Sequence, residues 1–235
     1  MYDPLETDIS YEYLIKLKDK ATGLRFGIIG GWGVFFHVNE EYKRAFGRDY
    51  LKSRDIDVFI GSNDEEKFDK VIADMEFKPS SYNFRYELIY DRTEKVIIPL
   101  EKAKKKHIFD LIYVFLDVFS DKKTKTVGSW VFPHLSKAKI ENISNCPVLD
   151  INALLDLKAT SFFEREKLDK ELKDACDIYA LLFYSAYKIK PNIVIKKAIE
   201  KLVSRLDLQE YIAENVLGDS LKVGLVKNRL SGINS

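Results

Sequence analysis

The chain has 235 residues, of which 46% are hydrophobic and 32% are charged, and its formal net charge is +1. This composition is typical of a folded globular protein and excludes an intrinsically disordered chain. The near-zero net charge also argues against a strongly basic nucleic-acid-binding protein, although it leaves local basic patches open.

The cysteines and the apolar runs bear on the cellular compartment. Cys146 and Cys176 lie far apart and lack the spacing of metal ligands. We interpret them as reduced thiols of a cytoplasmic protein. Residues 1–8 lack a basic region followed by an apolar run, so no signal peptide is expected. The longest apolar runs, such as residues 108–119, contain aspartates and are too short to span a bilayer.

The front of the chain alternates between predicted helices and strands. Helices are predicted over 7–21, 32–44 and 65–75, because apolar residues recur there at helical spacing. Strands are predicted over 24–29, 55–60, 83–90, 95–100, 107–116 and 128–132.

From Leu149 onward the pattern predicts helices and no strand. The expected helices cover 151–164, 167–187, a segment that starts at Pro191, 207–215 and 219–230. We therefore expect an α/β domain over residues 1–146 and a helical domain over residues 147–235.

The most informative motif is Asp55-Ile56-Asp57, which lies 25 residues after the glycine pair Gly30-Gly31. Side chains alternate along a strand, so Asp55 and Asp57 share one face while Ile56 points into the core. Two like charges on one face repel each other unless a positive charge lies between them. A divalent cation bound by carboxylate oxygens is the expected solution.

A third carboxylate is needed to complete such a site. Asp110 lies inside the apolar strand predicted over 107–116, where an ionised carboxylate is costly unless it is paired or bound to metal. Asp117 is the competing candidate, but at the predicted strand end a turn or capping role is the simpler interpretation. We therefore prefer Asp110.

These motifs together resemble the nucleotidyltransferases of the DNA polymerase β superfamily. The match is closest to small prokaryotic members of the abortive-infection and toxin–antitoxin type. It rests on Gly30-Gly31-Trp32-Gly33 and on Ser53-Arg54-Asp55-Ile56-Asp57. The resemblance implies an α+β fold, in which a short mixed sheet flanked by helices is followed by a helical C-terminal domain.

The resemblance also implies roles for individual residues. Three catalytic carboxylates would hold two Mg²⁺ ions, and the glycine turn would hold the triphosphate of an NTP together with Ser53. The carboxylates would be Asp55, Asp57 and Asp110, and the glycines Gly30 and Gly31.

A weaker match in the helical half adds two nucleotide contacts, Lys158 and Arg165. They are followed by Lys173-Asp174 and Asp177, as in many members of the family. The simpler alternative is that this segment forms a solvated helix face.

Two positions depart from the family pattern. Many relatives have Arg where this chain has Leu51, and Arg48 and Arg54 are the nearby substitutes. Superfamily members often have Ser where this chain has Gly31. The loss of that hydroxyl leaves the backbone N–H groups at the helix start to bind phosphate.

The expected activity is Mg²⁺-dependent transfer of a nucleoside monophosphate from an NTP to a hydroxyl on a tRNA, a protein or a small molecule. A toxin–antitoxin role would add an antitoxin partner, and no membrane partner is expected. One alternative is a non-catalytic nucleotide-sensing or partner-binding scaffold with the same fold. A second is an aminoglycoside-type nucleotidyltransferase, whose acceptor pocket would use acids such as Glu87 or Glu164.

Overall fold

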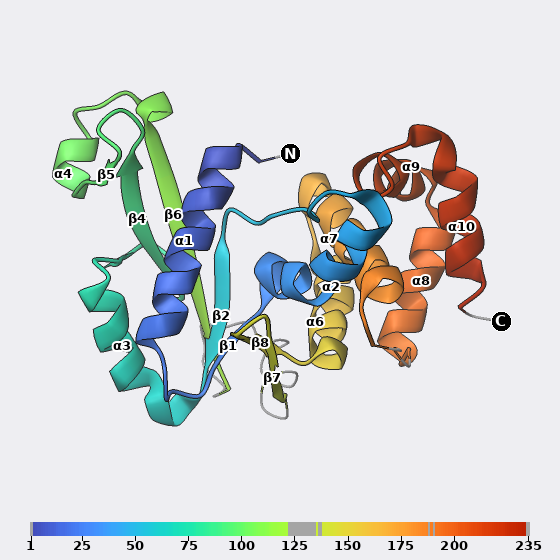
Figure 1. The fold of residues 1–235 in the computed structure, drawn as a ribbon, viewed down its shortest axis with the longest axis horizontal. Coiled ribbons are helices and arrows are strands. Elements are labelled where there is room, and N and C mark those ends of the chain that lie inside the picture. The colour runs from blue at the N-terminus through green and yellow to red at the C-terminus, as the bar shows by residue number, and fades with distance from the viewer. Residues whose placement is uncertain (1, 122–134, 136–137, 188, 190, 234–235) are drawn as a thin grey trace. The chain divides into compact units, whose positions relative to one another are not determined.

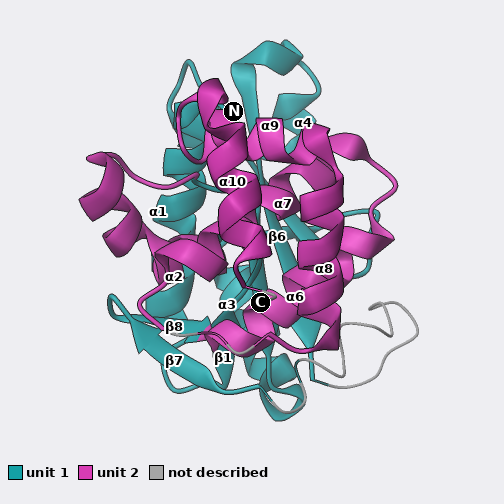
Figure 2. Ribbon diagram, turned by 90° about the vertical axis from the view of Figure 1, so that its right-hand side faces the viewer, with its two compact units in different colours: residues 1–32, 52–148 teal, residues 33–51, 149–235 magenta. Residues whose placement is uncertain are grey.

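The structure, a computed structural model, describes residues 2–121, 135, 138–187, 189 and 191–233. The chain forms two compact units, Met1–Trp32 with Lys52–Val148 and Gly33–Leu51 with Leu149–Ser235 (Figure 2). The predicted boundary near residue 146 lies close to the division after Val148. The structure differs from the prediction at residues 33–51, which group with the helical unit although they were expected in the α/β domain.

The first unit contains a mixed β-sheet. Its strand order is β3-β4-β6-β2-β1-β8-β7, and β5 pairs with β4. β2 runs antiparallel to β1 and parallel to β6, while β4 runs antiparallel to β6. The strands are β1 (Phe26–Ile28), β2 (Ile56–Ile60), β3 (Lys78–Pro79), β4 (Arg85–Asp91), β5 (Val96–Ile97), β6 (Leu111–Ser120), β7 (Ile140–Ile143) and β8 (Cys146–Leu149).

Helices of the first unit flank this sheet. They are α1 (Pro4–Lys20), α3 (Glu65–Asp74), the short α4 (Leu100–Ala103) and the beginning of α2 (Gly30–Phe46), which continues into the second unit. A mixed sheet with flanking helices, followed by a helical region, confirms the predicted fold class.

The two faces of the sheet differ in chemistry. Ile56 and Val58 of β2 are fully buried on one face, as the alternation predicts. Figure 1 shows α1 and α3 lying along the sheet, and the ring of Phe68 in α3 packs 5.7 Å from that of Phe26 in β1. Because Phe26 pairs with Ile60, α3 covers the apolar face of β2. Asp57 therefore points to the opposite face.

Strand β6 begins later than predicted. Residues 108–110 form a 3₁₀ turn, in which the backbone N–H of Phe109 donates to Nδ1 of His107 at 3.5 Å. The strand then covers Leu111–Ser120, whereas it was expected over 107–116. As a result Asp110 precedes the strand and Asp117 lies inside it.

The sequence interpretation missed the hairpin formed by β7 and β8. Its two-residue turn consists of Ser144 and Asn145, with φ values of 51° and 61°. Two consecutive positive φ values are the property of a type I′ turn. β3 and α4 were also missed, because two and four residues carry no periodic signal. The strand expected over 128–132 lies outside the described residues.

The second unit is helical, and its helices confirm the predicted ones to within a few residues. α6 and α7 pack against each other, and α6 also contacts α8. Asp150 caps α6 by accepting from the N–H of Ala153 at 3.2 Å. The helices are α6 (Ile151–Glu164), α7 (Leu168–Tyr184), α8 (Ile193–Ser204), α9 (Leu206–Asn215) and α10 (Val223–Ser231). Across the residues that the structure describes, no helix combines the length and apolar character needed to cross a membrane.

Candidate functional site

The Asp-x-Asp motif lies where β2 begins. Asp57 is the second residue of β2 and faces away from the core, and Asp55 stands in the bend just before the strand. The Oδ1 atom of Asp55 is buried and has no hydrogen-bond partner. The Nε atom of Arg54 is 3.6 Å away, which is an ion-pair distance and too long for a hydrogen bond. A buried carboxylate oxygen in this condition is ready to accept a cation.

Gly30 and Asp57 make an unusually close approach. Gly30 has a φ of +61°, and a Cβ atom placed on it would lie 2.0 Å from Oδ2 of Asp57. The neighbouring backbone is also bonded, because the N–H of Ile29 donates to the carbonyl of Asp57 at 2.9 Å. The carboxylate of Asp57 therefore lies directly against the first residue of α2.

The N-terminus of α2 suits an anion. Its first turn, Gly30-Gly31-Trp32-Gly33, contains no acidic side chain, so no residue within it neutralises the positive end of the helix dipole. Trp32 anchors this turn to α1, because its indole N–H donates to Oγ of Ser10 at 3.0 Å. The backbone N–H groups at such a helix start can bind phosphate oxygens.

The third carboxylate beside Asp57 is Asp117, and the prediction that Asp110 completes the group is wrong. Asp117 of β6 pairs with Asp57 in the parallel ladder, so the two side chains share a face. Asp110 is exposed in the 3₁₀ turn. It lies seven residues before Asp117, which is roughly 20 Å along an extended strand.

Side-chain alternation in β6 explains this correction. The even-numbered residues Ile112, Val114 and Leu116 are buried in the core, whereas Tyr113 and Phe115 are only partly buried. Asp110 has the parity of the core residues, and Asp117 has the parity of the other face. That signal was present in the sequence, and it favoured Asp117.

Arg85 of β4 binds Asp117 with two parallel hydrogen bonds. Its Nε donates to Oδ1 and its Nη2 donates to Oδ2, both at 2.7 Å. The hydrogen bond to Asp117 is the main factor that raises the pKa of the Arg85 guanidinium, and the charges of Asp117, Asp55 and Asp57 raise it further against the effect of burial. Arg85, which the sequence interpretation missed, therefore lies among three carboxylates.

The donor set fits a divalent cation at Asp55 and Asp57. Within the described part of the chain, no three His, Cys, Asp or Glu side chains are grouped closely enough to hold a metal ion. Both oxygens of Asp117 accept hydrogen bonds from Arg85, whereas Oδ1 of Asp55 accepts none. Mg²⁺ is commonly held by one or two carboxylates together with waters and substrate phosphates. The Oδ1 atom of Asp55, which is buried and accepts no hydrogen bond, makes this pair suitable for one ion.

The structure also locates the other predicted residues near the motif. Ser53 is buried two residues before Asp55, and its contact with phosphate stays a prediction. Of the two substitutes for the missing arginine, Arg54 lies beside Asp55. The Arg48 guanidinium instead stacks 5.9 Å from the ring of Tyr42 in the helical unit.

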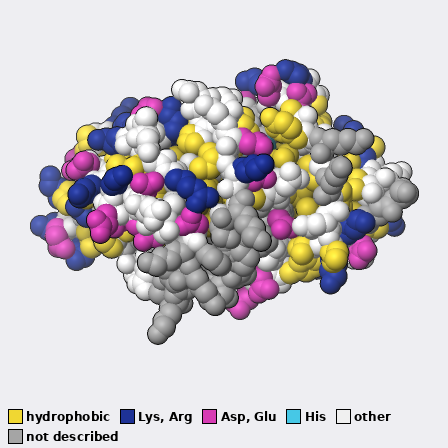
Figure 3. Space-filling view, turned by 90° about the horizontal axis from the view of Figure 1, so that it is seen from below, with side chains coloured by type: hydrophobic (Ala, Val, Ile, Leu, Met, Phe, Trp, Pro, Cys, Tyr) yellow, Lys and Arg dark blue, Asp and Glu magenta, His cyan; other side chains and the backbone are white. Residues whose placement is uncertain are grey.

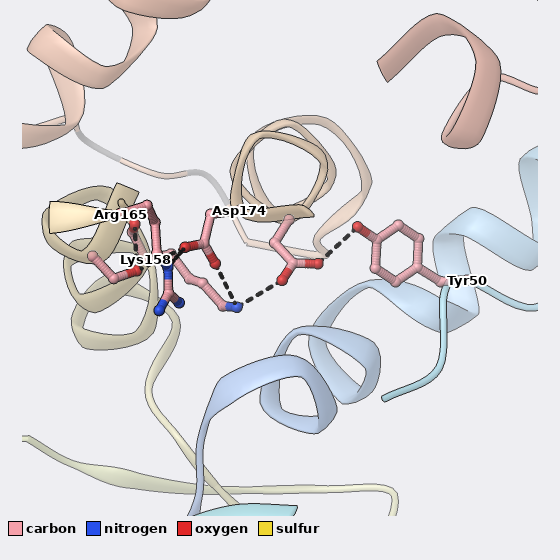
Figure 4. A network of polar contacts seen from close by, with 6 residues as sticks. Tyr50, Lys158, Arg165 and Asp174 are labelled. Atoms are coloured by element: carbon pink, nitrogen blue, oxygen red, sulfur yellow. Dashed lines mark hydrogen bonds and ion pairs between the residues drawn. The ribbon is translucent and has the colours of Figure 1, made fainter. Parts of the chain in front are cut away.

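Lys158 and Arg165 belong to a charge network inside the helical unit (Figure 4). The Nζ atom of Lys158 donates to Oδ1 of Asp174 at 3.1 Å and to Oδ2 of Asp177 at 2.6 Å. The Nε atom of Arg165 donates to Oδ2 of Asp174 at 2.6 Å. These contacts join α6 to α7, so the solvated helix face considered for this segment does not describe Lys158, which is buried.

Tyr50 extends the same network and was missed by the sequence interpretation. Its hydroxyl donates to Oδ1 of Asp177 at 3.0 Å. Burial, followed by the charge of Asp177, raises the pKa of Tyr50 well above its usual value. Burial also tends to raise the pKa of Asp174, but the Lys158 charge and the Arg165 hydrogen bond outweigh it and lower that pKa. Nucleotide binding by Lys158 and Arg165 stays a prediction.

Comparison with known proteins gives structural similarity alone. No family model matches the sequence, and no curated protein matches it. The chain is similar to an antigenic nucleotidyltransferase-like protein from Paracoccidioides brasiliensis, with 17% identity, a TM-score of 0.49, and coverage of 91% of this chain and 97% of that one. JHP933 from Helicobacter pylori gives 10% identity and a TM-score of 0.49, with coverage of 100% and 95%. ANT(2")-Ia in complex with adenylyl-2"-tobramycin gives 12% identity and a TM-score of 0.42, with coverage of 97% of this chain and 99% of that one.

Proposed function

We propose that this protein is an Mg²⁺-dependent nucleotidyltransferase that moves a nucleoside monophosphate from an NTP to a hydroxyl group. One observation carries the proposal: the carboxylate of Asp57 lies against Gly30 at the start of α2, and Asp55 stands in the bend just before β2. A phosphate placed at this helix start would meet backbone N–H groups and a carboxylate-bound cation together.

Different residues would bind the metal ion and the triphosphate. Asp55 and Asp57 would hold the ion, while the backbone at Gly30 and Gly31 and the hydroxyl of Ser53 would hold the triphosphate. When bound, Mg²⁺ would neutralise phosphate charge and make the α-phosphorus a better electrophile. The bound Mg²⁺ would also offset the mutual repulsion of these two carboxylates.

The reaction balances without another reactant. The acceptor oxygen forms a bond to the α-phosphorus, and the bond from that phosphorus to the bridging oxygen of pyrophosphate breaks. Pyrophosphate leaves with the electron pair, and the hydroxyl proton passes to water or to a carboxylate. The protein contributes by aligning the two substrates and stabilising charge.

Of the two predicted cations in the helical unit, Arg165 is the better phosphate candidate. Its side chain is 31% exposed, whereas that of Lys158 is 10% exposed and bonded to two carboxylates. A phosphate would have to displace both Asp174 and Asp177 to reach Lys158. We therefore assign Lys158 mainly to the stability of the helical unit.

Calorimetry tests the proposal. ATP, GTP, CTP and UTP are titrated with Mg²⁺ into the wild type and into the double variant Asp55→Ala/Asp57→Ala, which is expected to lose binding. Asp110→Ala is the matched control, because this exposed carboxylate lies outside the group and should bind as the wild type does. Equal binding in all three proteins, or binding in none, would contradict the proposal.

A non-catalytic nucleotide-sensing scaffold is the second candidate. It is favoured by Arg85, which occupies both oxygens of the third carboxylate. Incubation of the purified protein with α-³²P-labelled NTPs and total cell lysate separates the two. Transfer of label to any acceptor supports the enzyme, whereas tight NTP binding without transfer supports the scaffold.

The acceptor, the antitoxin partner and the aminoglycoside alternative stay predictions. On the face that Figure 3 shows, the Lys and Arg side chains of the described residues lie interspersed with Asp and Glu side chains. Such mixed charge does not favour an RNA acceptor over a protein or a small molecule. Adding tRNA and aminoglycosides separately to the labelling assay distinguishes these acceptors.

A further inference from the structure

The register of the β-sheet places Arg85 beside Asp117, the third carboxylate of the site. Arg85 is the register partner of Asp117 in the antiparallel β4–β6 pair, so both side chains leave the same face at the same level. The ladder continues beside them, because the N–H of Val118 donates to the carbonyl of Phe84 at 2.8 Å. The ion pair therefore rests on a fixed backbone.

Two aromatic rings hold the guanidinium in place. Its centre lies 4.7 Å from the ring centroid of Phe115 and 5.8 Å from that of Tyr82. A planar cation gains from such ring faces and from two-pronged bonding to a carboxylate. Lysine could reproduce the charge but not both bonds. The Arg85–Asp117 pair is therefore fixed in position by its surroundings, unlike an isolated ion pair on the surface.

The same face carries the metal-binding pair. Asp57 is the register partner of Asp117 on the other side of β6, and neighbouring strands are about 4.8 Å apart. A divalent ion bound by Asp117 would have to replace both hydrogen bonds from Arg85. It would also stand against a positive charge that arginine cannot lose in a protein.

We propose that Arg85 takes the place of a second metal ion, so that this protein binds one divalent ion, at Asp55 and Asp57. This inference rests on the proposed function and replaces the expectation of two ions. Arg85 is a positioning residue whose two hydrogen bonds keep Asp117 outside the metal coordination.

The number of bound Mn²⁺ ions tests the proposal without any activity measurement. Equilibrium titration of Mn²⁺ alone, followed by electron paramagnetic resonance, is expected to give one ion per wild-type chain and two per Arg85→Gln chain. The double variant Arg85→Gln/Asp117→Asn should return to one ion. Arg92→Gln is the control, since Arg92 follows β4 and pairs with Asp3 at 2.6 Å, away from the motif; it should bind one.

The outcomes separate this inference from the proposed function. Two ions on the wild type, or one ion on a folded Arg85→Gln protein, overturn the role of Arg85 and leave the nucleotidyltransferase proposal standing. No Mn²⁺ on either protein overturns both. Should Arg85→Gln not fold, Arg85→Lys replaces it: this variant keeps the charge and is expected to bind one ion, and two ions would overturn the proposal.

Discussion

Gly30 is the residue on which the geometry of the site depends most. It is required twice, once by its φ of +61° and once by the carboxylate of Asp57, which occupies the space of a Cβ atom. The first requirement costs any L-residue about 1–2 kcal/mol. The second requirement arises because a Cβ atom at this position would displace the Asp57 carboxylate, which we propose binds the metal.

Gly30→Ala tests both requirements against a matched control. Gly23 also has a positive φ, of +88°, but a Cβ atom there would meet nothing within 4 Å. Gly23→Ala is therefore expected to cost about 1 kcal/mol in the free energy of unfolding and to leave Mn²⁺ binding unchanged. Gly30→Ala should cost more and weaken Mn²⁺ binding at least tenfold. Urea unfolding and Mn²⁺ titration check this, and indistinguishable variants would contradict it.

Asp174 shows the cost of a buried charge whose partners are removed. It accepts from Lys158, Arg165 and Ser161 and is almost fully buried. Asp174→Asn would leave Lys158 short of a counter-charge, and such losses cost about 3–5 kcal/mol. Tyr50→Phe removes only a hydroxyl from Asp177 and should cost about 1.5–3 kcal/mol. Urea unfolding at pH 7 measures both, and an equal loss would argue against the buried charge as the cause.

The Asp174 network also predicts a pH dependence. The pKa of Asp174 is lower in the folded protein than in the unfolded chain, where it is near 3.8. Its contribution to stability is therefore full above about pH 4 and disappears as the pH falls through the lower, folded-state pKa. Unfolding at pH 7, 5 and 3 should show the difference between wild type and Asp174→Asn unchanged at the first two and reduced at the third. A difference that shrinks between pH 7 and 5 would contradict this.

At the scale of elements, the register between strands decides which carboxylates meet. β2 and β6 are parallel, and one pairing, Asp57 with Asp117, places two carboxylates on neighbouring strands. β4 adds Arg85 through its own register with β6. A shift of one residue in either pairing would turn the partner to the other face.

The β7–β8 turn offers a prediction at this scale. Asn145 has a φ of 61°, which glycine adopts without strain and a β-branched residue strongly disfavours. Asn145→Gly is expected to change the free energy of unfolding by less than 1 kcal/mol in the stabilising direction, and Asn145→Val to destabilise by about 1–2 kcal/mol. Thermal unfolding compares them, and a tolerated valine would show that this turn does not need a positive φ.

At the scale of the whole molecule, ligand binding should be visible as stability. A nucleotide with Mg²⁺ that binds the folded chain alone adds about 2.7 kcal/mol when its concentration is one hundred times Kd. The wild type should therefore melt at a higher temperature with Mg²⁺ and NTP, while Asp55→Ala/Asp57→Ala should not respond. Each ligand component is tested alone as a control, and an equal shift in both proteins would place the binding site elsewhere.

The sequence by itself determined most of the helices and several of the strands, and it located the Asp-x-Asp motif. Helical periodicity and capping residues located the helices of the second unit, and the alternation in residues 55–60 placed Asp55 and Asp57 on one face. The glycine pair marked the start of α2. These features are local, because each depends on residues a few positions apart.

The tertiary structure decided which partners the remaining residues meet. Asp117, Arg85 and Tyr50 reach their partners through strand register or helix packing across 32 to 127 residues of sequence. Local propensity carries no information about such pairings, and the free energy of the whole sheet and helix bundle selects them. The sequence interpretation chose Asp110 as the third carboxylate, although the parity of β6 favoured Asp117. The β2–β6 register places Asp117 beside Asp57, and the β4–β6 register pairs it with Arg85.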